Sequence, residues 1–179
     1  MNIVVAISEV SRPGSSSVAE RVCELIDGVE LAVPFTTRLP PSAEEDGFVF
    51  TSQDVFDRMI ASDEFLEHVE ICGHRYGTPR RSLQDARDNG NDLLVRVDER
   101  GVSQIKLKLP NAVSVLVLHE SEQHKHASIA IEHLLYRRLQ KLSQMRSPDT
   151  FDHVVTDDGL EESANRVVAI IRAERSRRS

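Results

Sequence analysis

A continuous apolar run near the N-terminus, Ile3 to Ile7, constrains the fold more than any other feature of this sequence. A run without polar alternation is typical of a strand that is covered on both faces, as strands in parallel sheets are. Further apolar strands are predicted at Asp92–Val97, Ala112–Leu118 and His153–Thr156, and helical spacings of apolar residues separate the strands. This alternation predicts an α/β fold, a parallel sheet with helices on both faces.

Length and composition limit the class of protein. A chain of 179 residues with 40% hydrophobic residues is enough for one domain with a full core. The net charge of −7 argues against nucleic acid as the main partner. Cys23 and Cys72 are too few for a disulfide scaffold, and the start of the chain has neither a basic flank nor a long apolar run. We therefore expect a cytoplasmic protein without a membrane partner.

The segment from Glu64 to Arg80 combines a strand pattern with a misplaced charge. Phe65, Val69 and Ile71 alternate with polar residues, as in a half-buried strand. Glu67 falls on the apolar side of this alternation, where a carboxylate is unfavourable unless something binds it. The pattern therefore marks Glu67 as a candidate binding residue.

A turn and a helix start are predicted directly after this strand. Thr78 is a good N-cap, Pro79 suits the first helical position, and Gly90 can end the helix. In this interpretation the turn brings Glu67, Tyr76 and Thr78 close together as a polar cluster.

An ordered set of short motifs runs through the chain. They are TTR at 36–38, E-x-D-G at 44–47, EFLE at 64–67, YGTPR at 76–80, VD-x-x-G at 97–101 and the C-terminal FDHVVTDDGLEES from 151. In this order and spacing the set resembles the guanylate kinase family, over about 3–175. The resemblance implies a P-loop nucleoside-monophosphate-kinase-like sheet in one domain, 1–179. Its expected parts are a core at 1–33 and 79–175, a GMP-binding lobe at 34–78 and a shortened lid at about 121–138.

The resemblance implies a GMP site built from five residues. Arg38 would bind the phosphate and Tyr76 would donate a second hydrogen bond to it, while Glu67, Thr78 and Asp98 would read the guanine edge. The chemistry agrees, because a carboxylate can accept from the N1–H and 2-amino group of guanine and arginine suits bidentate phosphate contact. Simpler interpretations remain for single residues: a solvated arginine at 38, a turn-packing ring at 76 and a plain helix cap at 78.

The phosphate loop departs from the pattern G-x-x-x-x-G-K-[ST]. With Gly14 as the second glycine, Glu9 stands at the first glycine, Ser15 at the lysine and Ser16 at the metal-binding hydroxyl. Arg12 could supply charge from another direction. The degenerate loop therefore comprises Glu9, Arg12, Gly14, Ser15, Ser16 and Ser17. The alternative is a loop that only turns the chain and caps a helix.

Two further departures concern the GMP side and the lid. Pro41 stands where the family has a second arginine, and Phe48 falls near a loop tyrosine. In the lid, Arg138 best matches a catalytic arginine of the family, with a charged helix face as the alternative. His124 and His126 flank a lysine on a polar helix, which does not supply a zinc site, so we expect no metal centre.

Three functional hypotheses follow. The first is a guanylate-kinase-like protein that binds GMP or a related phosphorylated ligand, with a degenerate ATP site and weak or no phosphoryl transfer. The second is an active ATP-dependent GMP kinase with a non-standard loop, for which Mg·ATP would be required. The third is a protein-interaction module that binds a phosphorylated protein through the same pocket.

Overall fold

The computed structural model describes residues 2–9, 17–40, 47–119, 151–157 and 159–178. Its main sheet has five strands in the order β2-β7-β1-β8-β9, and every neighbouring pair is parallel. The strands are β1 (Val4–Glu9), β2 (Val29–Leu31), β7 (Asp92–Arg96), β8 (Val113–His119) and β9 (His153–Asp157). The predicted parallel sheet is confirmed, with the apolar N-terminal run as its central strand.

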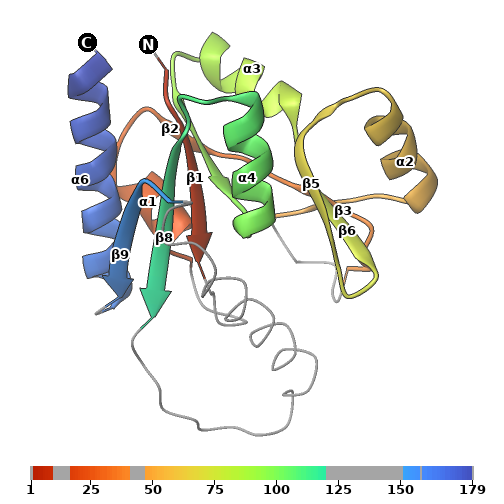
Figure 1. The fold of residues 1–179 in the computed structure, drawn as a ribbon, viewed down its shortest axis with the longest axis horizontal. Coiled ribbons are helices and arrows are strands. Elements are labelled where there is room, and N and C mark those ends of the chain that lie inside the picture. Colours follow the sequence, from red (N-terminus) through yellow and green to blue (C-terminus); the bar gives the residue numbers. More distant parts are fainter. Residues whose placement is uncertain (1, 10–16, 41–46, 120–150, 158, 179) are drawn as a thin grey trace, which may run out of the picture.

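Helices cover both faces of this sheet (Figure 1). One face packs against α1 (Val18–Leu25) and α6 (Leu160–Arg178), and the other against α3 (Arg80–Asp88) and α4 (Glu99–Lys108). Alternate side chains of the N-terminal run enter the two cores: Ile3, Val5 and Ile7 on the α1/α6 side, Val4 and Ala6 on the other. The run is apolar throughout because both of its faces are buried.

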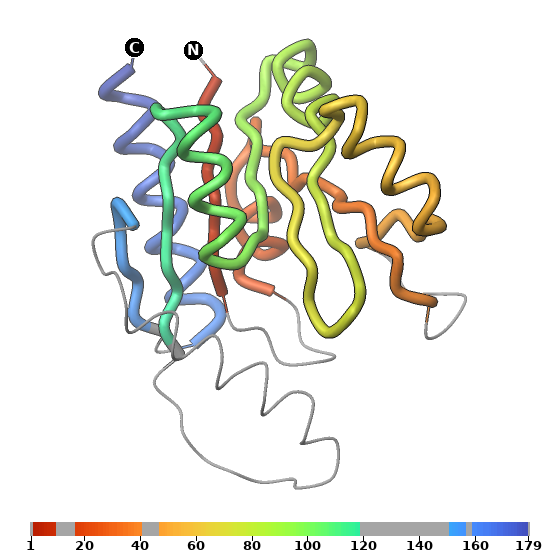
Figure 2. The backbone as a smooth tube through the Cα atoms, turned by 45° about the vertical axis from the view of Figure 1, so that its right-hand side comes forward, coloured from red at the N-terminus to blue at the C-terminus, as the bar shows by residue number. Residues whose placement is uncertain are grey.

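A second, smaller sheet lies beside the main one together with α2 (Gln53–Ala61), as Figure 2 shows. Its order is β4-β3-β6-β5. The strands are β3 (Phe35–Thr36), β4 (Val49–Phe50), β5 (Phe65–Ile71) and β6 (His74–Pro79). Strands β5 and β6 form an antiparallel hairpin, whose turn uses positive φ angles at Cys72 (52°) and Gly73 (78°).

The hairpin corrects one local prediction. Thr78 does not cap a helix: it belongs to β6, where it pairs with Glu67, and Pro79 precedes the first residue of α3. Pairing with β5 continues through Pro79, so the tertiary contact overrides the local preference of a Thr-Pro pair for a helix start. Gly90 follows the end of α3 with a φ of 76°, as predicted for a helix-terminating glycine.

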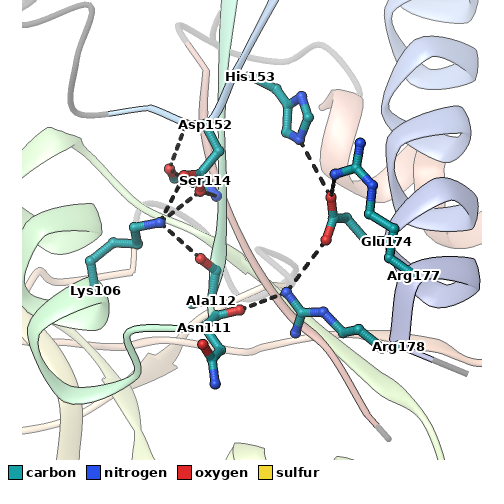
Figure 3. A network of polar contacts seen from close by, with 9 residues as sticks. All are labelled: Lys106, Asn111, Ala112, Ser114, Asp152, His153, Glu174, Arg177 and Arg178. Carbon is teal, nitrogen blue, oxygen red and sulfur yellow. Dashed lines mark hydrogen bonds and ion pairs between the residues drawn. The ribbon is translucent and has the colours of Figure 1, made fainter.

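Polar side chains form a network of contacts at the end of the main sheet where β8 and β9 begin (Figure 3). Lys106 Nζ donates to Asp152 Oδ2 at 2.7 Å and to the carbonyl of Ala112 at 3.1 Å. The same Asp152 oxygen accepts from the backbone N–H of Ser114 at 2.8 Å. On α6, the Glu174 carboxylate contacts the side chains of His153, Arg177 and Arg178. These contacts join α4, β8, β9 and α6 away from the strand carboxyl ends.

A buried carboxylate also joins the first and last elements. Asp92 Oδ1 accepts from the backbone N–H of Ile3 at 2.7 Å, and its Oδ2 accepts from Arg175 Nε at 2.7 Å. Arg175 donates further to the carbonyls of Asp27 and Gly28. The end of α6 is thereby tied to the β2-β7 edge of the sheet.

Two further observations complete the fold. The predicted lid, at about 121–138, lies outside the described residues. Among the helices that are described, none combines the length and apolar character needed to cross a membrane.

Candidate nucleotide site

Glu67 is the most deeply buried carboxylate of the small sheet. Its residue is 3% exposed, and its Oε1 accepts two hydrogen bonds from Thr78, one from the backbone N–H at 2.9 Å and one from Oγ1 at 2.7 Å. The register of the hairpin places these residues opposite each other. Thr78 therefore fixes one oxygen of the carboxylate and leaves the other for a further donor.

Burial raises the pKa of Glu67 to about 7. The hydrogen bonds from Thr78 act in the opposite direction, and the negative charge of Asp98 adds to the increase. A buried carboxyl group with this pKa gains strongly from a ligand that donates hydrogen bonds to its charged form.

Asp98 belongs to the main-sheet side of the molecule and lies near the Glu67 carboxylate. It follows the carboxyl end of β7 and is the N-cap of α4, accepting from the backbone N–H of Gly101 at 2.9 Å. Its second oxygen pairs with Arg100 at 2.8 Å. The helix end thus orients Asp98 beside Glu67, and ligands of parallel α/β sheets lie at this edge.

Gly101 is a residue of this site that sequence analysis singled out only as part of a motif. A Cβ at this position would lie 3.0 Å from Glu67 Oε2 and 2.8 Å from Val97 Cβ. Only glycine lets α4 come this close to the buried carboxylate.

Arg38 is positioned by a hydrogen bond from its backbone N–H and by contacts of its guanidinium group with two phenylalanine rings. Its N–H donates to the Oγ1 of the fully buried Thr36 at 3.1 Å. Its guanidinium carbon lies 5.6 Å from the ring centre of Phe48 and 5.9 Å from that of Phe50. Cation–π contact with two rings restricts the guanidinium group. Sequence analysis noted Phe48 as a departure from a tyrosine and did not predict this contact.

Tyr76 connects the two parts of the site. Its ring packs edge-on against Phe48, with centroids 6.1 Å apart, and its backbone pairs with Thr36 on one side and Val69 on the other. Thr78 lies two residues further along the same strand, on the same face, about 7 Å away. The arginine and aromatic end therefore adjoins the carboxylate end.

The predicted phosphate loop is described only at its two borders. Glu9 Oε2 accepts from the backbone N–H of Val18, the first residue of α1, at 2.8 Å. Ser17 is the N-cap of that helix and forms a capping box with Glu20. The remaining loop residues, Arg12, Gly14, Ser15 and Ser16, lie outside the described residues, as do Arg138, His124 and His126.

The Glu9 carboxylate occupies the position where a helix N-terminus offers its first N–H to an anion. Burial raises the pKa of Glu9, whereas the hydrogen bond from Val18 and the charge of Arg96 lower it. Its Oε1 is buried and has no hydrogen-bond partner among the described residues. Within the same ranges, no group of three or more His, Cys, Asp or Glu side chains is placed to hold a metal ion.

Together these features define a parallel α/β fold with an inserted small sheet. The small sheet places a buried carboxylate, Glu67, near the carboxyl end of β7 and carries an arginine, Arg38, after β3. Comparison with known proteins assigns the family. The sequence model described as "Guanylate kinase" matches residues 6–174. This chain belongs to the guanylate kinase family.

Individual relatives agree along nearly the whole length. The guanylate kinase of Koribacter versatilis is 33% identical over 98% of this chain and 80% of its own length. That of Rickettsia bellii is 28% identical over 99% of this chain and 97% of its own. The crystal structure of guanylate kinase from Anaplasma phagocytophilum superposes with a TM-score of 0.72 at 26% identity, covering 97% of this chain and 86% of that one.

Proposed function

We propose that this chain binds GMP and phosphorylates it, with Mg·ATP as the phosphoryl donor. The observation that carries the GMP site is the buried Glu67 carboxylate, fixed at one oxygen by Thr78 and flanked by Asp98. The relatives named guanylate kinase, aligned over 98–99% of this chain, favour phosphoryl transfer over binding alone.

In this proposal each residue has a distinct role. Glu67 accepts hydrogen bonds from the N1–H and 2-amino group of guanine. Asp98 accepts a hydrogen bond from a further donor on the same edge of the base. Arg38 binds the phosphate of GMP with its guanidinium fork, and Tyr76 donates its hydroxyl hydrogen to the same group. With the proposed domain limits, a lobe at 34–78 and a core on either side, we expect the base to bind between the two sheets.

The described end of the ATP site carries a carboxylate, Glu9, at the start of α1, with the charge of Arg96 nearby. Phosphate binding at a helix N-terminus needs free N–H groups and cations, whereas Glu9 places a carboxylate against the first N–H of α1. This contact favours a second candidate function, GMP binding with weak or no transfer. Neither the family match nor the named relatives point to a phosphorylated protein as ligand.

Calorimetric titration with GMP, together with an assay of ADP formation from Mg·ATP and GMP, tests the proposal. Arg38→Ala should weaken GMP binding by about 2–4 kcal/mol if the arginine meets the phosphate in a desolvated site. Arg81→Ala, on the exposed face of α3 with a side chain 81% exposed, is the matched control and should change nothing. Absence of GMP binding by the wild-type protein would exclude both candidate functions.

The Glu9→Gln variant separates the two candidates. Removing the negative charge should raise Mg·ATP affinity several-fold, because the phosphate then meets a neutral amide. GMP-dependent ADP formation by the unmodified protein supports the kinase, whereas GMP binding without it, even in Glu9→Gln, supports the binding protein.

A further inference from the structure

The strand that carries Glu67 is irregular and lies at an edge. β5 is the last strand in the order β4-β3-β6-β5, so among the described residues no strand lies on its outer side. Its pairing with β6 shifts register between Phe65 and Glu67. Such irregularities turn a side chain away from its regular direction and leave the local ladder incomplete. The backbone at Glu67 therefore gains from support outside the hairpin, in addition to the hydrogen bonds by which Thr78 holds the carboxylate.

Side chains of α4 supply that support along the outer edge of β5. Gln104 pairs with His68 in both directions: its Oε1 accepts from the backbone N–H at 3.1 Å, and its Nε2 donates to the carbonyl at 2.8 Å. Lys108 Nζ donates to the carbonyl of Phe65 at 2.9 Å, and Arg100 donates to that of Glu70 at 3.2 Å. The three donors are spaced four residues apart on one helix, so they face the strand together.

Gln104 contacts His68, the residue that directly follows Glu67 in the chain. The N–H that it binds belongs to the peptide joining Glu67 to His68, so the contact fixes the plane of that peptide. Lys108 holds the strand at Phe65, on the other side of the register shift. α4 thus braces both ends of the irregular stretch, while Thr78 holds the carboxylate from β6.

We propose that Gln104 is a positioning residue for the guanine-reading carboxylate: its amide replaces a missing strand neighbour and aims Glu67 at the ligand. This proposal rests on the proposed GMP site. It assigns to α4 a role in base specificity, which is distinct from its packing role through the fully buried Val102 and Ile105.

The position of Gln104 allows a clean test. The residue is partly exposed and lines a surface hollow together with His68, Arg100 and Ile60. Water can therefore reach the edge of β5 when the amide is removed, and the variant should stay folded. Gln104→Met keeps the length of the side chain and removes both hydrogen bonds. Gln84→Met on α3, where the amide donates a hydrogen bond to the exposed Asp88, is the matched control.

The measurement is the ratio of affinities for GMP and inosine monophosphate, determined by calorimetry. Inosine monophosphate lacks the 2-amino group, so it makes only one of the two contacts with Glu67. Gln104→Met should weaken GMP binding about tenfold and inosine monophosphate binding much less, so the ratio falls. Gln84→Met should keep the wild-type ratio. A residue that only stabilised the fold would lower the melting temperature and leave the ratio unchanged.

The outcomes distinguish this proposal from the proposed function. If the wild-type protein does not bind GMP, the GMP site itself is wrong. If the wild type prefers GMP and Gln104→Met keeps the same ratio, only the positioning role is wrong. Should Gln104→Met fail to fold, Gln104→Glu decides by the same ratio, since it keeps an acceptor for the His68 N–H and loses the donor to the carbonyl. A reduced ratio in that variant supports the role, and an unchanged ratio overturns it.

Discussion

Around neutral pH the Glu67 carboxyl group is close to the midpoint of its titration, because burial raises its pKa to about 7. The ordinary value of 4.5 applies once the chain unfolds. Between these two values the folded protein retains a proton that the unfolded chain releases. Stability linked to Glu67 is therefore greatest at low pH and decreases as the pH rises from 4.5 to about 7.

Replacing Glu67 by glutamine should remove this pH dependence. We expect the free energy of unfolding of the wild type, relative to Glu67→Gln, to fall by on the order of 3 kcal/mol between pH 4.5 and 8. Urea denaturation of both proteins across this range measures the difference directly. Because other titrating groups are common to both proteins, their contributions cancel. Parallel stability curves for the two proteins would contradict the raised pKa.

At the scale of secondary-structure elements, residues at the ends of β3 and β4 together position the guanidinium group of Arg38. Arg38 follows β3, while Phe48 precedes β4 and Phe50 ends it. The rings contact the guanidinium group from the neighbouring strand. This arrangement reduces the conformational freedom that Arg38 would lose on binding a phosphate.

Phe48→Leu tests this contribution. The substitution keeps an apolar side chain but removes the cation–π contact, so the affinity for GMP should fall by about 0.5–1 kcal/mol. Guanosine, which lacks the phosphate, serves as the control ligand in the same calorimetric titration. Equal losses for GMP and guanosine would show that Phe48 acts on the base side or on the fold, and not through Arg38.

Periodicity in the sequence predicted most elements of the main sheet, because strands covered on both faces leave continuous apolar runs. The strands predicted at Ile3–Ile7, Asp92–Val97, Ala112–Leu118 and His153–Thr156 lie close to the observed β1, β7, β8 and β9. The start of α3 was not, since Thr78 and Pro79 suit a helix N-terminus locally and only pairing with β5 keeps them extended.

The components of the candidate site were less accessible from the sequence. Glu67 could be singled out because a carboxylate on an apolar face is unusual. The contact of Glu9 with Val18 could not be predicted, since it depends on where α1 begins relative to the end of β1. The bracing of β5 by Gln104 likewise requires the packing of α4 against β5, with Gln104 and His68 36 residues apart in the chain.

At the scale of the whole molecule, the ion pair between Asp92 and Arg175 closes the fold. Arg175→Met should lower the free energy of unfolding by about 2 kcal/mol, because it leaves a buried carboxylate with only the Ile3 N–H as a described partner. Thermal or urea unfolding at neutral pH measures this loss. Arg172→Met, at an exposed position one turn earlier on α6, is the control and should be close to neutral. Equal stability of the two variants would contradict a structural role for the pair.

The last described helix, α6, is synthesised late, although one of the two cores depends on it. Of all the described elements, α6 leaves the ribosome last, yet Ala164, Val167, Val168 and Ile171 complete the core that covers one face of β1. Among the described residues, those of the opposite core come from the chain up to Leu116, except for Phe151. During synthesis the nascent sheet therefore has one face nearly covered, while the other is covered only by α1 and keeps an exposed apolar part. Chaperones that bind nascent chains should contact mainly that second face, until the last helix docks.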